Sequence, residues 1–451
     1  MKEQEIVKEL IYELGNSENM GFNFATSRNG VQCSFTPKFI TLSKDLANSI
    51  HINNKQLKNN IETDNLTKIL QQCMIDFYTE NEFEKFDNNS REIFFKLKSY
   101  IIDSIIKTLE TYTHYIPVDT LGMEKIKKIK LDTIEILSIE DWIDSIDISG
   151  RECFDNFDWR KYLQDSLKKK NPIKPNEPCD YMIESIFDFI EKTPALIKIT
   201  IEGYEKDFSY KLANIVAKTT LDSLSLLFNE DVFYQQILLS ERIIPINSMR
   251  MVETNSKLWL PGRSLSQRIP MIAPSKAYDE LINSRNEDFM KSLSTILSSL
   301  INSESSKYPK LSSRWATALD WYAEGIREQN DAIAVTKIAT ALDVLSNGGK
   351  CKGILNMIVT IFDCKEEDIL IGGKTAKEFV RLLYNSSRSQ ILHGTHYERL
   401  KSFEMERTES TELVKIVLYN CLLFLNKYEG EDSNEGFREV YNLSKQEDTS
   451  V

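Results

Sequence analysis

The stretch ALDWYAEGIREQNDAIAVTKIATALDVLSNGG, residues 318–349, decides the fold of the C-terminal part of the chain. Apolar residues recur at helical spacing around and within it, in two sets: first Trp315, Leu319, Tyr322 and Ile326, then Ala334, Ile338, Ala341, Leu342 and Leu345. Ser312 is a candidate N-cap for the first helix. Gly348 and Gly349 end the second, because glycine commonly stops helices. The stretch therefore predicts two consecutive amphipathic helices.

Helical patterns continue from this stretch to about residue 428. GILNMIVTIF (353–362) and TELVKIVLYNCLLFLNKY (411–428) are apolar enough for core helices, and Thr375 and Glu378 are spaced as a capping box at the start of another. We therefore predict an all-α helical bundle at residues 306–428. A polar, mobile tail is expected over residues 429–451.

The preceding 305 residues mix helical and strand patterns. EIFFKLKSYIIDSIIKTLETY (92–112) has helical spacing, whereas KIKKIKLDTIEILSI (125–139) and ALIKITIEGYE (195–205) are typical of strands. DSLKKKNPIKPNEPCD (165–180) carries three prolines and is typical of a loop or linker. We therefore expect an α+β region over residues 1–305, with a sub-boundary near 165–180.

The charge of the chain limits the kinds of partner it can have. Its 451 residues carry a formal net charge of -12, which argues against a protein that coats nucleic acid nonspecifically. A local basic site remains compatible with this charge. The stretches MEKIKKIK (123–130) and LKKKNPIK (167–174) could guide RNA, although most charge runs are simply solvated surface.

The cysteines and the hydropathy of the chain indicate its compartment. The seven cysteines include no CxxC pair, which fits a reducing cytosol better than a disulfide framework or a zinc site. No apolar stretch approaches the length needed to span a bilayer. We therefore expect a cytoplasmic protein without membrane partners.

Two familiar binding motifs are incomplete near the C-terminus. GGKT (372–375) lacks the glycine that a phosphate-binding P-loop needs five positions before Gly373, where the chain has Asp368. A helix N-cap is the better interpretation. His393 and His396 are spaced like two ligands on a helix, but no nearby Cys, Asp or Glu completes a set, so no metal is expected.

The stretch YNSSRSQILHGTH (384–396) contains two of the four histidines of the chain. His393 follows Arg388 by five residues and directly precedes Gly394. This spacing alone proves little, because an arginine followed by a histidine at that distance occurs readily by chance. The residue types nevertheless suit phosphate chemistry. Arginine offers a permanently charged planar fork of donors, and histidine exchanges protons near neutral pH.

Residues 318–349 together with LLYNSSRSQILHG (382–394) resemble the HEPN superfamily, and in particular its Apea-like branch. The family's signature, an arginine followed four to six residues later by a histidine, falls on Arg388 and His393. A glycine follows the histidine, and Ser389 is the polar residue after the arginine. The resemblance covers only the C-terminal helical domain.

This resemblance implies a metal-independent endoribonuclease that needs no cofactor. The 2′-hydroxyl of the RNA would attack the adjacent phosphate, Arg388 would stabilise the negative charge of the transition state, and His393 would transfer a proton. The products would be 2′,3′-cyclic phosphate and 5′-hydroxyl ends. Proteins of this kind resemble toxins and antiphage defence effectors that cleave tRNA or other cellular RNA.

The resemblance also implies an assembly and an organisation of the chain. HEPN domains usually pair so that two Arg/His motifs meet in one cleft, so we expect a C2 homodimer through the C-terminal helical domain. The N-terminal region would serve sensing or specificity, and a trigger or an inhibitor could act there.

The spacing of the Arg/His pair raises a geometric problem. Five residues along an ideal α-helix rotate a side chain by about 140°, so Arg388 and His393 would not share a face. Either the helix deforms near residues 385–387, or each site draws groups from two subunits. Asp343, where related domains often carry an acid, could orient Arg388. Four neighbours could contact the substrate: Tyr384, Ser389, Gln390 and His396.

A second interpretation needs no catalysis. Arg388 could be a surface ion-pair residue and His393 could cap a helix end. The chain would then be a non-catalytic HEPN module that dimerises or binds a ligand, acting as a regulatory or structural partner.

Overall fold

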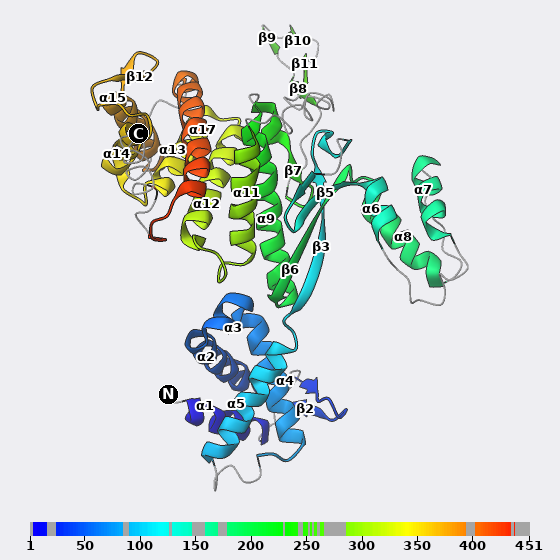
Figure 1. Cartoon of the computed structure of the whole chain (residues 1–451). Helices are drawn as coiled ribbons and strands as arrows, with labels where there is room; N and C mark the ends of the chain where they lie inside the picture. The colour runs from blue at the N-terminus through cyan, green and yellow to red at the C-terminus, as the bar shows by residue number, and fades with distance from the viewer. Residues whose placement is uncertain are drawn as a thin grey trace. The chain divides into compact units, whose positions relative to one another are not determined.

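The computed structural model describes the chain in segments (Figure 1), which are residues 3–15, 24–83, 90–125, 129–146, 158–169, 178–228, 231–241, 247–250, 253–254, 257–258, 262–265, 286–393, 402–433 and 437. The predicted fold class is confirmed: helices and a five-stranded sheet come first, and a mostly helical region follows. Contacts divide the chain into two compact units, residues 1–113 with 200–213, and residues 114–199 with 214–451.

The first unit is a group of helices with one small hairpin. Its elements before residue 110 are α1 (Glu3–Gly15), β1 (Phe24–Thr26), β2 (Gln32–Ser34), α2 (Pro37–Asn53), α3 (Lys55–Asn60), α4 (Thr63–Thr79) and α5 (Ser90–Ile106). Helix α2 packs against α1 and α4, and α4 packs against α5, which buries side chains such as Leu10, Phe39 and Leu70. Thr36 begins α2, because its hydroxyl accepts a hydrogen bond from the N–H of Phe39.

A five-stranded sheet has the strand order β4-β5-β6-β3-β7. Its strands are β3 (Glu110–Asp119), β4 (Ile129–Leu131), β5 (Ile134–Ser138), β6 (Ala195–Tyr204) and β7 (Ile237–Leu238). Strands β5 and β6 are antiparallel, with Ile136 opposite Ile197, and both side chains are buried. The strands predicted within residues 125–139 and 195–205 are therefore confirmed.

The helix predicted over residues 92–112 was wrong at its C-terminal end. Helix α5 stops at Ile106, and β3 begins at Glu110. The residues after 110 are rich in Thr and Tyr, which favour strands. The hydroxyl oxygens of Thr113 and Thr200 lie 3.1 Å apart between β3 and β6. Pairing in the sheet therefore overrides the helical spacing of the preceding residues.

Further helices and hairpins follow the sheet strands in the chain. They are α6 (Ile139–Ser145), α7 (Trp159–Lys169), α8 (Pro178–Ile190), α9 (Lys206–Leu227), β8 (Asn247–Arg250), β9 (Glu253–Thr254), β10 (Lys257–Leu258) and β11 (Gly262–Leu265). Helices α6, α7 and α8 share a small core that includes Trp142, Trp159 and Phe187. Strands β8 and β11 form one antiparallel pair, and β9 and β10 form another.

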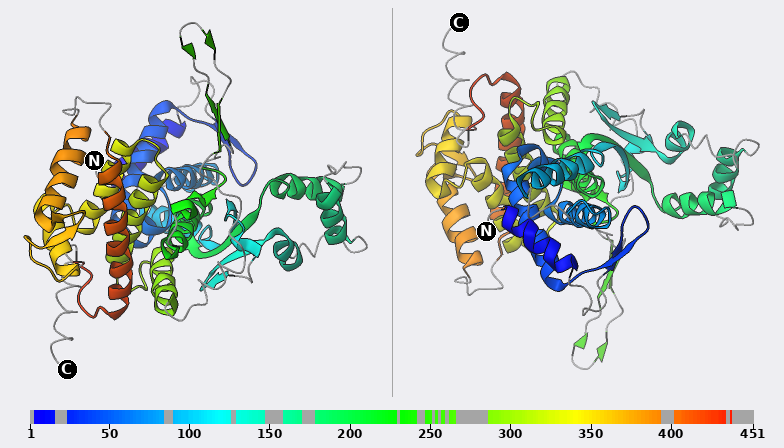
Figure 2. Two further views of the ribbon diagram at one scale, coloured as in Figure 1. Left: turned by 90° about the horizontal axis from the view of Figure 1, so that it is seen from above. Right: turned by 90° about the horizontal axis from the view of Figure 1, so that it is seen from below.

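The C-terminal region consists of helices with one short hairpin (Figures 1 and 2). Its elements are α11 (Glu287–Ile301), α12 (Pro309–Arg327), α13 (Asp331–Leu345), α14 (Lys350–Ile361), β12 (Ile369–Ile371), β13 (Lys374–Thr375), α15 (Ala376–Arg381), α16 (Gln390–Leu392) and α17 (Glu404–Lys427). Helices α11, α12 and α13 each pack against α17. The apolar stripes predicted from the sequence lie on α12 and α13 and are buried, as expected.

Polar atoms of the buried aromatic residues tie α12 to α17. The indole N–H of Trp315 donates to the carbonyl oxygen of Leu418 over 2.9 Å, and the hydroxyl of Tyr322 donates to the carbonyl oxygen of Thr411 over 3.1 Å. Both aromatic side chains are fully buried. These bonds satisfy groups that would be costly to bury unpaired, and they also set the position of one helix against the other.

The start of α12 differs from the prediction. The helix begins at Pro309, so Ser312 lies inside it and is not its N-cap. The carboxylate of Asp432 instead accepts hydrogen bonds from the N–H groups of Lys310 and Leu311, both over 3.0 Å. Asp432 belongs to the predicted tail, whose residues 434–436 and 438–451 lie outside the described residues.

The division into compact units does not follow the predicted boundary at residue 305. The C-terminal helices share a unit with most of the sheet and with α6 to α8. Helix α11 begins before that boundary and packs on α12 and α17. The ammonium of Lys415 donates to the carbonyl oxygen of Phe228 over 2.7 Å, which adds a polar link. Within the predicted sub-boundary near 165–180, residues 170–177 lie outside the described residues.

Candidate functional site

A π-helical segment, Leu382–Ser389, lies between α15 and α16. Helix α15 begins at the predicted capping box: the Thr375 hydroxyl accepts from the N–H of Glu378, and the Glu378 carboxylate accepts from the N–H of Thr375. A π-helix has a wider turn than an α-helix, is rare, and often marks a functional site. The helix therefore deforms across residues 385–387. This is the first of the two alternatives given by the sequence, the other being a site shared by two subunits.

Three side chains hold the guanidinium of Arg388 within this segment. Its Nη2 lies 3.1 Å from Oδ2 of Asp343, and its Nε donates to Oγ1 of Thr340 over 3.3 Å. The carbon atom Cζ lies 5.0 Å from the ring centroid of Tyr384, a cation–π contact. The side chains of Arg388 and Asp343 are 19% and 15% exposed, so solvent screens their attraction only partly.

The partners of Arg388 are themselves anchored on α13. Thr340 and Asp343 are three residues apart and therefore lie on one face of the helix. The Thr340 hydroxyl donates to the carbonyl oxygen of Thr336 over 2.8 Å, and Oδ1 of Asp343 accepts from the N–H of Lys350 over 3.2 Å. The structure thus brings Asp343 to Arg388, the arrangement expected if this acid orients the guanidinium. Thr340 was not among the residues that the sequence singled out, because its contact with Arg388 depends on how α13 packs against the π-helix.

This arrangement leaves part of the guanidinium able to bind a ligand. Arginine has five N–H donors, and the described contacts engage only Nε and one side of Nη2. Nη1 of Arg388 has no hydrogen-bond partner among the described residues. A half-buried guanidinium with donors to spare is suited to hold a phosphate or another oxyanion.

His393 ends the short helix α16 and is exposed. Its backbone N–H donates to the carbonyl oxygen of Ser389 over 3.0 Å. Within the described segments its imidazole makes no hydrogen bond or ion pair, with Arg388 or with any other residue. The imidazole is therefore accessible for proton exchange. The π-helical deformation therefore does not by itself bring the imidazole of His393 into contact with the guanidinium of Arg388 within the described residues.

The remaining candidates differ in their positions. Tyr384 is half-buried and contacts Arg388 through its ring, whereas Ser389 is half-buried and Gln390 is exposed. His396 lies outside the described residues. The structure therefore groups Tyr384 and Asp343 around Arg388 and leaves Gln390 and His393 on the surface of the same segment.

The GGKT sequence forms a hairpin turn between β12 and β13. Gly372 and Gly373 have φ of 56° and 73°, in the left-handed region that glycine adopts without strain. The ammonium of Lys374 lies 2.7 Å from a carboxylate oxygen of Glu409, and Thr375 is the N-cap of α15. This geometry agrees with the N-cap interpretation and differs from a P-loop, in which the lysine faces a bound phosphate.

The described residues offer neither a metal site nor a membrane-spanning helix. Within the described segments, no group of three or more His, Cys, Asp or Glu is arranged to hold a metal ion. No helix in the part of the chain that the structure describes is long and apolar enough to cross a membrane. The two lysine-rich stretches include residues 126–128 and 170–174, which lie outside the described residues.

Comparison of the chain with protein-family models, with curated proteins and with solved structures finds no match. The resemblance to HEPN domains therefore depends on the sequence motif alone. The function has to be inferred from the chemistry of the site.

Proposed function

We propose that the chain is a metal-independent endoribonuclease of the HEPN type, in which Arg388 and His393 carry the chemistry. One observation supports this function most. An acid, a hydroxyl and an aromatic ring hold the guanidinium of Arg388 in a π-helical turn, with donors to spare, five residues before an exposed histidine.

The proposed reaction uses the 2′-hydroxyl of the RNA as the nucleophile. Its oxygen bonds to the adjacent phosphorus, its proton leaves to a base, and the bond from phosphorus to the 5′-oxygen breaks. That oxygen takes up a proton and leaves as a 5′-hydroxyl. Arg388 would stabilise the extra negative charge on the phosphoryl oxygens, and His393 would serve one of the two proton transfers.

A homodimer would complete this site. His393 is on the surface and has no described contact with Arg388 of its own chain, so a histidine from a second copy could approach the guanidinium. A two-fold pairing would bring two arginines and two histidines together, which would supply both a base and an acid. Light scattering on the purified protein should then give twice the mass of one chain.

A non-catalytic function remains the second candidate, and one observation favours it. The ion pair with Asp343 and the hydrogen bond to Thr340 join the π-helix to α13. A purely structural arginine would make the same contacts. The chain would then be a dimerising or ligand-binding module without nuclease activity.

Cleavage of bulk tRNA in the presence of EDTA separates the two functions. The wild-type chain should produce fragments with 5′-hydroxyl ends, which a polynucleotide kinase can label directly. Arg388→Ala and His393→Ala should each lower the rate by about 100-fold or more. Arg381→Ala is the matched control, because Arg381 is an exposed arginine of the same helical region, and it should cleave like the wild type.

Expression in cells covers the case in which the protein needs a trigger that purification removes. The wild-type chain and Arg388→Ala are expressed separately, and the RNA ends in each culture are sequenced. Discrete new 5′-hydroxyl ends should appear only with the wild type. Equal toxicity and equal RNA ends for both proteins would refute the proposed nuclease and favour the non-catalytic module. The sequenced ends would also identify the RNA that is cut.

A further inference from the structure

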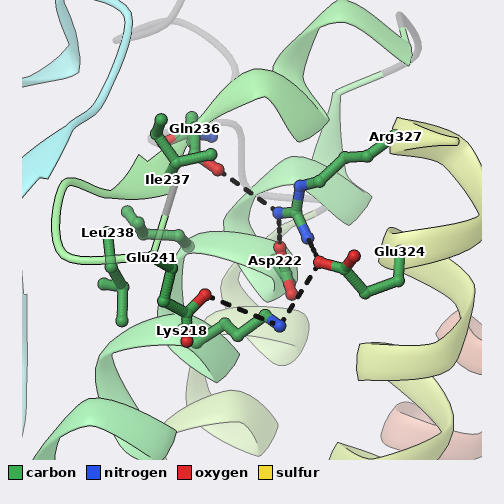
Figure 3. A pocket seen from close by; sticks show the side chains of 9 residues that line it. Lys218, Asp222, Gln236, Ile237, Leu238, Glu241, Glu324 and Arg327 are labelled. Carbon is green, nitrogen blue, oxygen red and sulfur yellow. Dashed lines mark hydrogen bonds and ion pairs between the residues drawn. The ribbon is translucent and has the colours of Figure 1, made fainter. Parts of the chain in front are cut away.

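A second group of charged side chains lies in the same unit and has no part in the proposed cleavage (Figure 3). It comprises Lys218, Asp222, Glu241, Asp320, Glu324 and Arg327, which we call the Asp222 cluster. Helix α9 and helix α12 supply five of these residues, and the sixth follows β7.

A buried ion pair forms the centre of the Asp222 cluster. The side chains of Arg327 and Asp222 are only 4% and 1% exposed, and Nη2 of Arg327 donates to Oδ1 of Asp222. Arg327 also donates from Nε to the carbonyl oxygen of Tyr234 over 2.6 Å and from Nη1 to Glu324 over 3.1 Å. The guanidinium is therefore well supplied with acceptors.

Two buried acceptors, one in the cluster and one beside it, lack a donor among the described residues. Oδ2 of Asp222 and Oε1 of Gln236 are inaccessible to solvent, and neither has a hydrogen-bond partner among the described residues. Gln236 cannot simply turn over, because its Nε2 already donates to Oγ of Ser225 over 3.0 Å. An unsatisfied buried acceptor costs about 1–3 kcal/mol. Figure 3 shows one oxygen of Asp222 directed at Arg327 and the other directed away from it.

Burial also affects the ionisation of Asp222. Burial raises the pKa of its carboxyl to about 6, although Arg327 and Lys218 act in the opposite direction. A cationic donor placed at the unpaired oxygen would lower this pKa again, since it would favour the charged carboxylate.

A cavity beside this carboxylate is large enough for a small molecule. Asp222 and Gln236 both line a recess of about 10 Å³, which is space for about one water molecule. A larger cavity of about 410 Å³ shares Lys218, Asp222 and Glu241 with this recess. Small-molecule sites commonly occupy about 300–1,000 Å³. Asp320, hydroxyl groups of α12 and apolar side chains complete its wall.

The charge of the cluster favours a cation. Two cationic and four acidic side chains leave a formal surplus of two negative charges. Lys218 does not offer a site for an anion, because its ammonium lies 2.7 Å from Asp320, 3.3 Å from Glu324 and 3.7 Å from Glu241. Burial opposes the charge of Lys218, but the hydrogen bond and charge of Asp320 outweigh it, so the pKa is raised.

We propose that the larger cavity binds a small organic cation rich in N–H donors, such as a diamine, with its charged end against Asp222, Glu241 and Asp320. Asp222 lines this cavity, so a small turn of its side chain would bring the unpaired oxygen to these N–H groups. The charge of the ligand would offset the negative surplus. Glu241 and Asp320 are 48% and 51% exposed, so their carboxylates can turn toward a ligand. A metal ion fits less well, because within the described segments no set of three or more His, Cys, Asp or Glu is arranged to hold one.

Calorimetric titration of the full chain with 1,4-diaminobutane tests this proposal. We expect saturable binding and a rise in melting temperature. Two probes of similar size should bind at least about tenfold more weakly. One is 1,4-butanediol, which has donors but no charge, and the other is tetramethylammonium, which has charge but no N–H groups.

Variants locate the bound cation. Glu241→Gln and Asp320→Asn should each weaken binding about tenfold, since each removes one charge-assisted contact, and both side chains are exposed enough for the fold to tolerate the change. Glu412→Gln is the matched control, because it removes an exposed carboxylate from α17 that does not line the cavity. It should bind like the wild type. Binding should also tighten as the pH rises from 5 to 7 and Asp222 ionises.

Two results would overturn the proposal. One is the failure of 1,4-diaminobutane to bind, or binding no tighter than that of butanediol, which would mean that water alone meets the unpaired oxygens. The other is unchanged affinity in the double variant of Glu241 and Asp320. Neither result depends on RNA cleavage, because the Asp222 cluster contains no residue of the Arg388 site.

Discussion

Replacing Asp343 with asparagine tests whether this acid positions Arg388, the proposed catalytic arginine. The change keeps the size of the side chain and keeps an oxygen that can accept the N–H of Lys350. It removes the charge that holds Nη2 of Arg388 at 3.1 Å. Only the hydrogen bond to Thr340, at 3.3 Å, and the contact with Tyr384, at 5.0 Å, would then hold the guanidinium.

The magnitude follows from the exposure and geometry of the pair. Exposed ion pairs contribute about 0.2–1 kcal/mol, and breaking a buried pair costs about 3–5 kcal/mol. Arg388 and Asp343 are 19% and 15% exposed, so we expect a loss of about 1–2 kcal/mol of stability. A displacement of about 1 Å in a catalytic group can lower the rate about 100-fold. We therefore expect kcat to fall about 10- to 100-fold, with little change in KM.

The assay is cleavage of an end-labelled RNA that the wild-type chain cuts, together with chemical denaturation of each variant. Asp331→Asn is the control, because Asp331 lies on the same helix and pairs with Arg407 at 2.7 Å, outside the Arg388 site. The control should lose a similar amount of stability and cleave within about twofold of the wild type. Equal cleavage by the two variants, whether both fall or both stay unchanged, would refute a positioning role for Asp343.

Three further predictions concern the fold and its charges. Gly325→Ala should lower the melting temperature, because the added Cβ would lie 2.6 Å from Cγ1 of Ile338. The cost of this overpacking should exceed the gain in helix propensity by about 1–2 kcal/mol. An unchanged melting temperature would show that α12 and α13 can separate freely. Trp315→Phe should cost about 2–3 kcal/mol in denaturation experiments, because it leaves a small cavity and removes the donor to the carbonyl oxygen of Leu418; a loss below about 0.5 kcal/mol would contradict the described packing. The pKa of Asp222 rises from 3.8 to about 6 on folding, so the protonated group adds stability that is fully present below pH 3.8 and is lost as the pH rises through 6. Relative to Asp222→Asn, the wild type should therefore lose up to about 3 kcal/mol between pH 4 and pH 7, and parallel stability profiles for the two proteins would contradict this assignment.

Local patterns were enough to predict much of the C-terminal helical region. The apolar stripe through Trp315 and Tyr322 repeats every three to four residues, and only one face of a helix can bury such a set. The capping box of Thr375 and Glu378 also came from the sequence, because its bonds join residues three apart. These features depend on neighbours in the chain, so spacing and residue type define them.

The Arg/His motif was visible in the sequence, but its surroundings were not. Spacing alone could not show that Thr340 and Asp343, 48 and 45 positions earlier, would meet Arg388, because that contact depends on how α13 packs against the π-helix. An ideal helix would place Arg388 and His393 on different faces. The sequence therefore allowed either a deformed helix or a site shared by two subunits, and could not decide between them.

Tertiary structure decided the features that join distant parts of the chain. Asp432 caps α12 from more than one hundred residues away, which overrode the local candidate Ser312. Asp222 and Arg327 looked like ordinary charged residues of two helices, and only folding buried them together. Residue spacing predicts periodic burial and local caps, whereas ion pairs, unpaired acceptors and cavities arise where separate helices meet. The physical reason is that the free energy of a buried polar group depends on every atom packed around it, and most of those atoms come from elsewhere in the chain.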